Sequence, residues 1–258
     1  MLQLDNKPVL ANCTGHYRES LPIADLKAHF LCVWSRSGRS GSTTPVTVVP
    51  DGCVDLLWSQ GKLMVAGPDT EPQLVDPAMT QIVGMRFAPG AACHWLGIPM
   101  SELVNCRIDL RDIWGSRADA LSDSMSTARS THEASIGLQA GFSRIAPEIA
   151  LPDRSMALAF RKLGNLGHHS GVAGLSAELN TSERTLRRQC QHYFGYGPKT
   201  LERILRFQRF LKLVRQVPQT GLGSLAFEAD YSDQAHLSRE VRALSGVSPR
   251  VLMQQFAA

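Results

Sequence analysis

The sequence contains no long apolar run, since no stretch approaches the roughly 18 apolar residues that a membrane-spanning helix needs. Its first ten residues, MLQLDNKPVL, lack the basic start and the apolar core of a secretory signal peptide. The six cysteines form no C-x-x-C pair, and in a chain without an export signal we expect reduced thiols. These absences argue against a membrane protein and against a secreted, disulfide-stabilised domain, and they predict a cytoplasmic protein.

Charged residues are sparse, at 19% of the chain, and they are unevenly distributed. Residues 1–149 hold 12 Lys and Arg against 15 Asp and Glu, a net charge of −3, whereas residues 150–258 hold 15 against 8, a net charge of +7. The two parts together give the net charge of +4 of the whole chain. A basic C-terminal half favours a polyanionic partner, and nucleic acid is the commonest.

The two halves also differ in the structures that they predict. Residues 1–115 contain β-branched runs interrupted by P-D-G, Q-G and G-P-D turn signals, which is typical of strands. Residues 131–153 read as a polar, poorly periodic connection, and from residue 154 the pattern is helical almost to the end. We therefore predict an α+β protein, with a β-rich domain over 1–140 and an all-α domain over 150–258.

The stretch NTSERTLRRQCQHYFGYGP, residues 180–198, predicts the second helix of a helix–turn–helix unit. A short helix at 172–180 precedes a turn, and Ser182 is a suitable N-cap for a helix that runs to about residue 194. The apolar residues of this helix recur at helical spacing, and its other side carries three arginines. Gly195 suits a left-handed helix stop, and a proline opens the next helix.

A second unit, DQAHLSREVRALSGVSP at 233–249, repeats this arrangement. A short helix at 222–230 and a turn precede a helix over about 233–245, which Gly246 ends and Pro249 follows. The residues predicted to face inward are Leu186, Cys190 and either Tyr193 or Phe194 in the first unit, and Leu237, Val241 and Leu244 in the second. Two units with the same spacing and stop signal indicate two helices that can each enter a major groove.

Between the units lies PKTLERILRFQRFLKLV, residues 198–214, which combines an apolar stripe with basic residues. A helix of about 17–20 residues spans roughly 25–30 Å, near the ~34 Å repeat of B-DNA. One such helix can hold two recognition helices in successive major-groove segments on one face of the duplex. Its arginines and the N-termini of the recognition helices are then predicted to contact phosphates. The residues with this predicted role are Ser182, Thr185, Arg203, Arg206, Arg209 and His236.

Residues 155–255 resemble the DNA-binding part of the AraC/XylS family of bacterial transcription regulators. LAFEADYSDQAHLSREVRALSGVSPRVL is similar to the family's C-terminal signature, and RTLRRQCQHYFGYGPKTLERILRFQRFLKLV to its first unit and linker helix. The resemblance implies double-stranded promoter DNA and RNA polymerase as partners. It also implies base-facing side chains at Arg184, Arg187, Arg188, Gln234, Ala235, Ser238 and Arg239. Arginine pairs well with guanine, and glutamine with adenine.

Two departures from the family pattern concern one turn and the core. Asp230 stands where glycine is usual in the second turn, so we expect that turn to be strained or differently shaped. Cys190 and Val241 occupy core positions that are often phenylalanine, so we expect a slightly looser core.

The N-terminal half resembles an uncharacterised sensor-like domain found ahead of such DNA-binding halves. Segments such as VVPDGCVDLLW, VAGPDT and GMRFAPGAACHWLGIPMSEL carry this resemblance, which implies an effector-binding or dimerisation domain, a small-molecule effector and a homodimer. Arabinose-type members of the family have a cupin-like barrel at this place. Asp55 and Arg86 are candidates for holding a polar ligand, with Trp58 lining the cavity. The alternative interpretation is a turn followed by a buried strand, with the tryptophan in the core.

Metal and thiol sites have weaker support. Cys13 with His16, and Cys93 with His94, fit no standard zinc spacing, and a lone cysteine is commonly a small core residue. The His168-His169 pair lies in a Gly-rich break, which predicts a solvated loop. We therefore predict no metal and no cofactor.

The leading hypothesis is a sequence-specific, ligand-responsive DNA-binding transcription regulator that is not an enzyme. The alternative is a DNA-binding half fused to a thiol-dependent enzyme or repair domain, which requires a depressed pKa at a cysteine such as Cys53 or Cys93. A third hypothesis is a DNA-binding module without a ligand, whose N-terminal half only dimerises.

Overall fold

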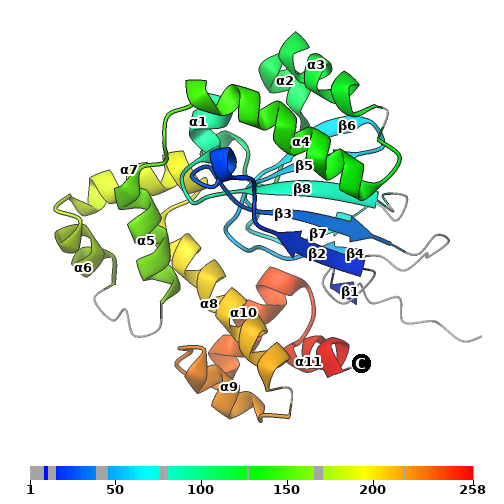
Figure 1. The fold of residues 1–258 in the computed structure, drawn as a ribbon. Helices are drawn as coiled ribbons and strands as arrows, with labels where there is room; N and C mark the ends of the chain where they lie inside the picture. The colour runs from blue at the N-terminus through cyan, green and yellow to red at the C-terminus, as the bar shows by residue number, and fades with distance from the viewer. Residues whose placement is uncertain are drawn as a thin grey trace, which may run out of the picture.

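The computed structural model describes residues 9–10, 16–38, 46–75, 79, 81–126, 128–165, 171–217 and 219–257. A β-rich N-terminal part is followed by a helical C-terminal part, which confirms the predicted fold class (Figure 1). Of the residues discussed above, Cys13, His168 and His169 lie outside this set.

The N-terminal part contains a six-stranded antiparallel sheet with the strand order β2-β3-β8-β5-β6-β9. Its strands are β2 (His16–Ser20), β3 (Phe30–Ser37), β5 (Asp55–Ser59), β6 (Lys62–Ala66), β8 (Gln81–Phe87) and β9 (Arg107–Asp109). A smaller sheet has the order β1-β4-β7. Its strands are β1 (Val9–Leu10), β4 (Val46–Val48) and β7 (Gln73–Val75).

Side chains alternate between the two faces of the larger sheet, as the pleat requires. Val33, Leu56 and Met85 lie side by side on one face, and each is 2% exposed or less. The other face carries Asp55 and Arg86, which lie opposite each other in the register of β5 and β8. The sheet therefore has one apolar face that helices cover and one face that holds charged side chains.

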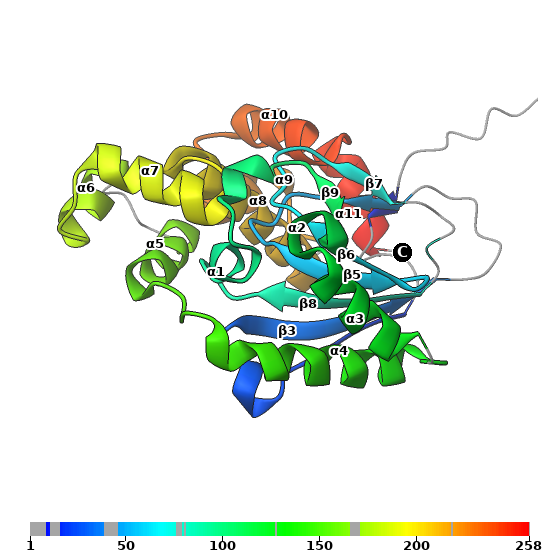
Figure 2. The same ribbon diagram turned by 90° about the horizontal axis from the view of Figure 1, so that it is seen from above.

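A long helix, α4 (Thr131–Ile145), covers the apolar face against β3 and β8 (Figure 2). The prediction of a poorly periodic connection over 131–153 is wrong in this part. Ala134, Leu138 and Phe142 recur every four residues and are fully buried, which holds the helix on the sheet. The other short helices of this half are η2 (Ala24–Leu26), α1 (Ala92–Leu96), η3 (Met100–Glu102), α2 (Leu110–Trp114), α3 (Ser116–Met125) and η4 (Ala146–Glu148).

The C-terminal part is helical, and its helices gather at one side of the β-rich part (Figure 1). They are α5 (Arg154–Gly164), α6 (Gly171–Glu178), α7 (Glu183–Phe194), α8 (Pro198–Gln216), α9 (Leu222–Glu228), α10 (Gln234–Ser245) and α11 (Pro249–Ala257). The residues predicted to face inward lie in a core of their own, where Leu186, Cys190, Leu237, Val241 and Leu244 are fully buried. Of the two alternatives at the end of α7, Phe194 is buried and Tyr193 is half-buried. Within the described residues, no helix is long and apolar enough to cross a membrane.

Candidate nucleic-acid interface

Helix α7 is the second helix of the first unit, and both of its ends are capped as predicted. The Ser182 hydroxyl accepts a hydrogen bond from the backbone N–H of Thr185 at 3.1 Å, which satisfies one of the free donors at the start of the helix. Gly195 ends the helix with a φ of 88°. The three arginines predicted to face bases, Arg184, Arg187 and Arg188, are all exposed.

Helix α10 repeats this design in the second unit. The Asp233 carboxylate accepts a hydrogen bond from the backbone N–H of His236 at 2.7 Å, and Gly246 ends the helix with a φ of 75°. The His236 ring is half-buried, and its Nδ1 lies 3.0 Å from the Ser232 hydroxyl. Of the residues predicted to face bases, Gln234, Ala235 and Arg239 are exposed, and Ser238 is half-buried.

The turn of each unit contains a non-glycine residue in the left-handed region. Asn180 has a φ of 50° in the first turn, and Asp230 has a φ of 68° in the second. Asn and Asp tolerate this conformation better than other residues that carry a side chain, because their side chains bond to nearby backbone. Asp230 therefore adopts in the second turn the same left-handed conformation that Asn180 adopts in the first.

Helix α8 joins the two units, and both recognition helices pack against it. It has 19 residues, which corresponds to a length of about 28 Å. Its apolar stripe is completely buried at Leu201, Ile204, Phe207 and Phe210. The helix is therefore a rigid connector of the length that the sequence predicts.

The arginines of α8 that were predicted to contact phosphate all have partners within the chain. Arg203 pairs with Glu240 at 3.1 Å, and Arg206 pairs with Glu202 at 3.0 Å. Arg209 donates hydrogen bonds to the carbonyl oxygen of Gly164 at 2.9 Å and to that of Ala229 at 3.4 Å. The Arg209 side chain is only 12% exposed, so its guanidinium is part of the folded interior of this half.

The residues proposed to bind an effector do not form one cavity. Arg86 makes two hydrogen bonds of 3.0 Å to the carboxylate of Asp55, and it pairs with Asp51 at 2.7 Å. Trp58 points to the opposite face of the sheet, where it is 9% exposed in the apolar core. Gly52, in the turn beside this cluster, packs against the C-terminal half, because a Cβ at Gly52 would lie 3.2 Å from Cδ1 of Leu201.

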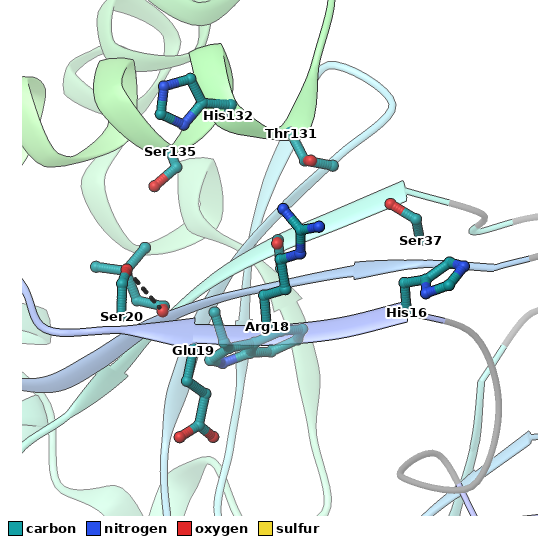
Figure 3. A pocket seen from close by; sticks show the side chains of 11 residues that line it. His16, Arg18, Glu19, Ser20, Ser37, Thr131, His132 and Ser135 are labelled. Carbon is teal, nitrogen blue, oxygen red and sulfur yellow. Dashed lines mark hydrogen bonds between the residues drawn. The ribbon is translucent and has the colours of Figure 1, made fainter.

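A groove of about 440 Å³ lies elsewhere, between the edge strand β2, β3 and the N-terminal half of α4. Figure 3 shows Arg18 pointing into the space between β2 and α4, whereas Glu19 points away from it. The polar and basic residues of its wall include His16, Arg18, Ser35, Ser37, Thr131 and His132. No local sequence pattern indicates this groove, because its walls come from segments that are distant along the chain.

Thiol catalysis needs a cysteine with a lowered pKa, whereas the pKa values of Cys53 and Cys93 are raised. Burial raises the pKa of the Cys53 thiol well above its ordinary value, and it raises that of Cys93 to about 11. Within the described ranges, no three His, Cys, Asp or Glu side chains gather closely enough to hold a metal ion. The thiol-enzyme hypothesis therefore gains no support from either cysteine.

Two family models match the chain. Residues 18–109 match a family described as a domain of unknown function (DUF6597), and residues 175–255 match one described as a helix-turn-helix domain. No curated protein matches the chain. Among solved structures, the apo form of a ToxT variant from Vibrio cholerae strain SCE256 is 12% identical, with 82% of this chain and 89% of that chain covered and a TM-score of 0.44. ToxT from Vibrio cholerae O395 is 12% identical over the same shares, with a TM-score of 0.41.

The helix-turn-helix match spans both recognition helices and the helix between them, so the two capped units form one DNA-binding domain. Residues 175–255 are therefore an AraC-type helix-turn-helix domain, which is the DNA-binding domain of transcription regulators.

Proposed function

We propose that this regulator binds promoter DNA at two successive major-groove segments, one read by α7 and the other by α10. The observation that carries the proposal is the same capped helix, with exposed polar side chains at its N-terminal end, on both sides of a 19-residue helix. In helix–turn–helix proteins that end of the recognition helix contacts base edges. The residues proposed to face bases are Arg184, Arg187, Arg188, Gln234, Ala235, Ser238 and Arg239.

Phosphate contacts are proposed at the N-terminal ends of both recognition helices, at Ser182, Thr185 and His236. Free backbone N–H groups and the helix dipole favour anions at this end. Arg203 and Arg206 reach phosphate only if their glutamate pairs open, since both are held within the chain. Arg209, which was predicted to bind phosphate, is assigned a structural role that a stability measurement tests.

The base-facing assignment is tested with a duplex that carries the two selected sequence blocks. Arg187→Ala is expected to weaken binding by about 1–3 kcal/mol and to relax the preference at one position of one block. Arg239→Ala is expected to do the same in the other block. Arg242→Ala is the matched control, because Arg242 is also exposed on α10 but lies in its last turn. Parent-like binding by both Arg187→Ala and Arg239→Ala would show that the assignment is wrong.

An effector of low molecular mass, with a carboxylate or phosphate group, is proposed to bind in the groove beside α4. The volume of about 440 Å³ suits a small metabolite. Arg18 supplies positive charge and two histidines supply ring nitrogen atoms for hydrogen bonds, while Glu19, the one acidic side chain among the described residues of the wall, points away (Figure 3). The polar hydroxyls of the wall supply hydrogen bonds that fix orientation.

The groove is tested by thermal unfolding of the full chain with inorganic phosphate and with a set of small mono- and dicarboxylates. A ligand that binds only the folded state raises the melting temperature. The increase is expected for the parent and for Arg129→Gln, a change outside the groove, and is expected to vanish in Arg18→Gln. The same increase in Arg18→Gln, or no increase with any of these anions in the parent, would refute this site.

The macromolecular partners, the place of action and the domain boundary are also proposed. RNA polymerase is proposed as the protein partner of a regulator that activates, a second copy of the chain as its dimer partner, and the cytoplasm as the place of action. The boundary between the effector half and the DNA-binding half is proposed after α4, within 146–153, because α4 packs on the sheet as far as Phe142.

A further inference from the structure

The C-terminal end of the first recognition helix is pressed against the N-terminal half of the chain. A Cβ at Gly195 would lie 2.7 Å from Cγ of Pro68, 2.9 Å from Cγ2 of Val104 and 3.0 Å from the carbonyl oxygen of Met100. Distances below 3.0 Å are not tolerated by real side chains, so only glycine fits at this contact. Gly195 therefore serves two purposes, since it ends α7 and lets the N-terminal half approach the helix end.

The second recognition helix meets the same loop at the equivalent position. A Cβ at Gly246, the residue that ends α10, would lie 3.7 Å from Cγ of Pro72, which is ordinary van der Waals contact. Pro68 and Pro72 belong to one short segment, Gly67–Pro72, called the bridging loop below. The bridging loop thus lies next to the C-terminal ends of α7 and α10, while the N-terminal ends that carry the base-facing side chains remain exposed.

Hydrogen bonds within the N-terminal half fix the conformation of the bridging loop. Asp69 is 7% exposed, and Arg107 donates two hydrogen bonds to its carboxylate, at 2.9 and 2.6 Å. Asn105 accepts from the backbone N–H of Thr70 at 2.8 Å and donates to the Thr70 hydroxyl at 2.9 Å. The backbone N–H of Asn105 also donates to the carbonyl oxygen of Pro68 at 3.1 Å. A paired buried carboxylate and a reciprocal amide pair make this loop a rigid support.

The helix between the two units is attached to the same half. Gln208, near the middle of α8, donates a hydrogen bond of 2.6 Å to the carbonyl oxygen of Pro50. The recognition helices are therefore joined twice, once through α8 and once through the bridging loop. A second rigid connection removes the bending and twisting freedom that a single 19-residue helix leaves between its two ends.

We propose that the bridging loop is a positioning element that fixes the separation and relative rotation of α7 and α10, and thereby sets the spacing of the two DNA blocks that the protein accepts. The inference rests on the proposed reading of two major-groove segments. When the two recognition helices are held rigidly, the protein binds well to DNA blocks at one spacing. At any other spacing, one helix leaves its groove or the protein must deform. A loosened loop lets the helices follow a different spacing at a smaller penalty.

The experiment uses the full chain and a set of duplexes that carry the selected blocks at their selected spacing, or at spacings changed by one and two base pairs. The parent is expected to prefer its own spacing on the order of tenfold, comparable to the loss of one base contact. Two variants loosen the loop. Asp69→Asn removes the charged pair with Arg107, and Pro68→Ala combined with Pro72→Ala removes both proline rings that lie next to the helix ends. Both variants are expected to reduce the preference for the selected spacing to less than about threefold, because the two recognition helices can then shift relative to each other.

Asp119→Asn is the matched control, since it removes an exposed ion pair with Arg111 in the same half and leaves the bridging loop intact. Unfolding curves establish that each variant is folded, and if Asp69→Asn is not, the double proline variant decides. A parent-like spacing preference in the folded variants refutes the inference alone. A parent that selects no site with two blocks refutes both the inference and the proposed function.

Discussion

Replacing Arg209 tests whether this arginine stabilises the fold or binds DNA. From the sequence, its place on a basic helix between two recognition helices predicts a phosphate contact. In the structure its guanidinium bonds to the last residue of α5, Gly164, and to Ala229 beside the second turn, with the carboxylate of Asp230 at 3.9 Å. Arg209 therefore connects α5, α8 and the second unit.

The effect of removing this guanidinium follows from its bonds. A hydrogen bond to a charged group contributes about 1.5–3 kcal/mol, and one of the two bonds of Arg209 is long at 3.4 Å. Replacing Arg209 by Met keeps the apolar stem and leaves two carbonyl groups without this donor. We expect the free energy of unfolding to fall by about 2–3 kcal/mol, which corresponds to a melting temperature lower by roughly 4–12 °C.

The assay compares Arg209→Met with Lys212→Met, because Lys212 lies on the same helix and is exposed. Thermal unfolding is followed by circular dichroism, and DNA affinity is measured over a range of salt concentrations. Arg209→Met is expected to lose stability with little change in the salt slope, whereas Lys212→Met is expected to change stability by less than about 0.5 kcal/mol. An unchanged melting temperature in Arg209→Met, together with a salt slope reduced by about 1, would refute the structural role and restore the phosphate contact.

Three further predictions concern the contact between the halves, pH and thiol reactivity. Gly195→Ala is expected to destabilise the chain more than Gly97→Ala in unfolding experiments. Both glycines end a helix at positive φ, but a Cβ at Gly97 meets open space. Equal losses of unfolding free energy in the two variants would contradict the close approach at Gly195. Burial, with His94 nearby, lowers the pKa of His29, so the folded state keeps this ring neutral. The stabilisation that the neutral His29 ring provides is complete above pH ~6.5 and is lost as the pH falls from there. The urea midpoint of His29→Gln should therefore respond less to pH than that of the parent. Cys93, whose pKa burial raises to about 11, is expected to react with iodoacetamide at pH 7.5 far more slowly than a small thiol, and rapid labelling of the folded chain would contradict this.

The ends of the recognition helices could be predicted because caps are local. Ser182, Gly195 and Gly246 act on groups a few residues away, so sequence spacing alone places them. The fully buried positions of both units follow from helical periodicity for the same reason. The base-facing residues predicted from the family pattern lie on the exposed or half-buried sides of α7 and α10, and whether they contact bases stays a prediction.

Features that depend on distant segments could not be predicted. Helix α4 was missed because glycines and polar residues lie between Ala134, Leu138 and Phe142, and the apolar Ile136 is exposed. The apolar pattern is therefore weak in the sequence alone. Trp58 and Asp55 were grouped by their closeness in sequence, although three steps along a strand place them on opposite faces. The partners of Arg209 and the walls of the groove come from other elements, and so no local pattern encodes them.

The central claim is that one chain reads two DNA segments with two recognition helices, and selection of binding sites from random duplex DNA by the full chain tests it most directly. We expect enrichment of two short sequence blocks about one helical turn apart, with Arg187→Ala relaxing one block and Arg239→Ala the other. Enrichment of a single block that both variants relax, or no enrichment at all, would contradict the claim.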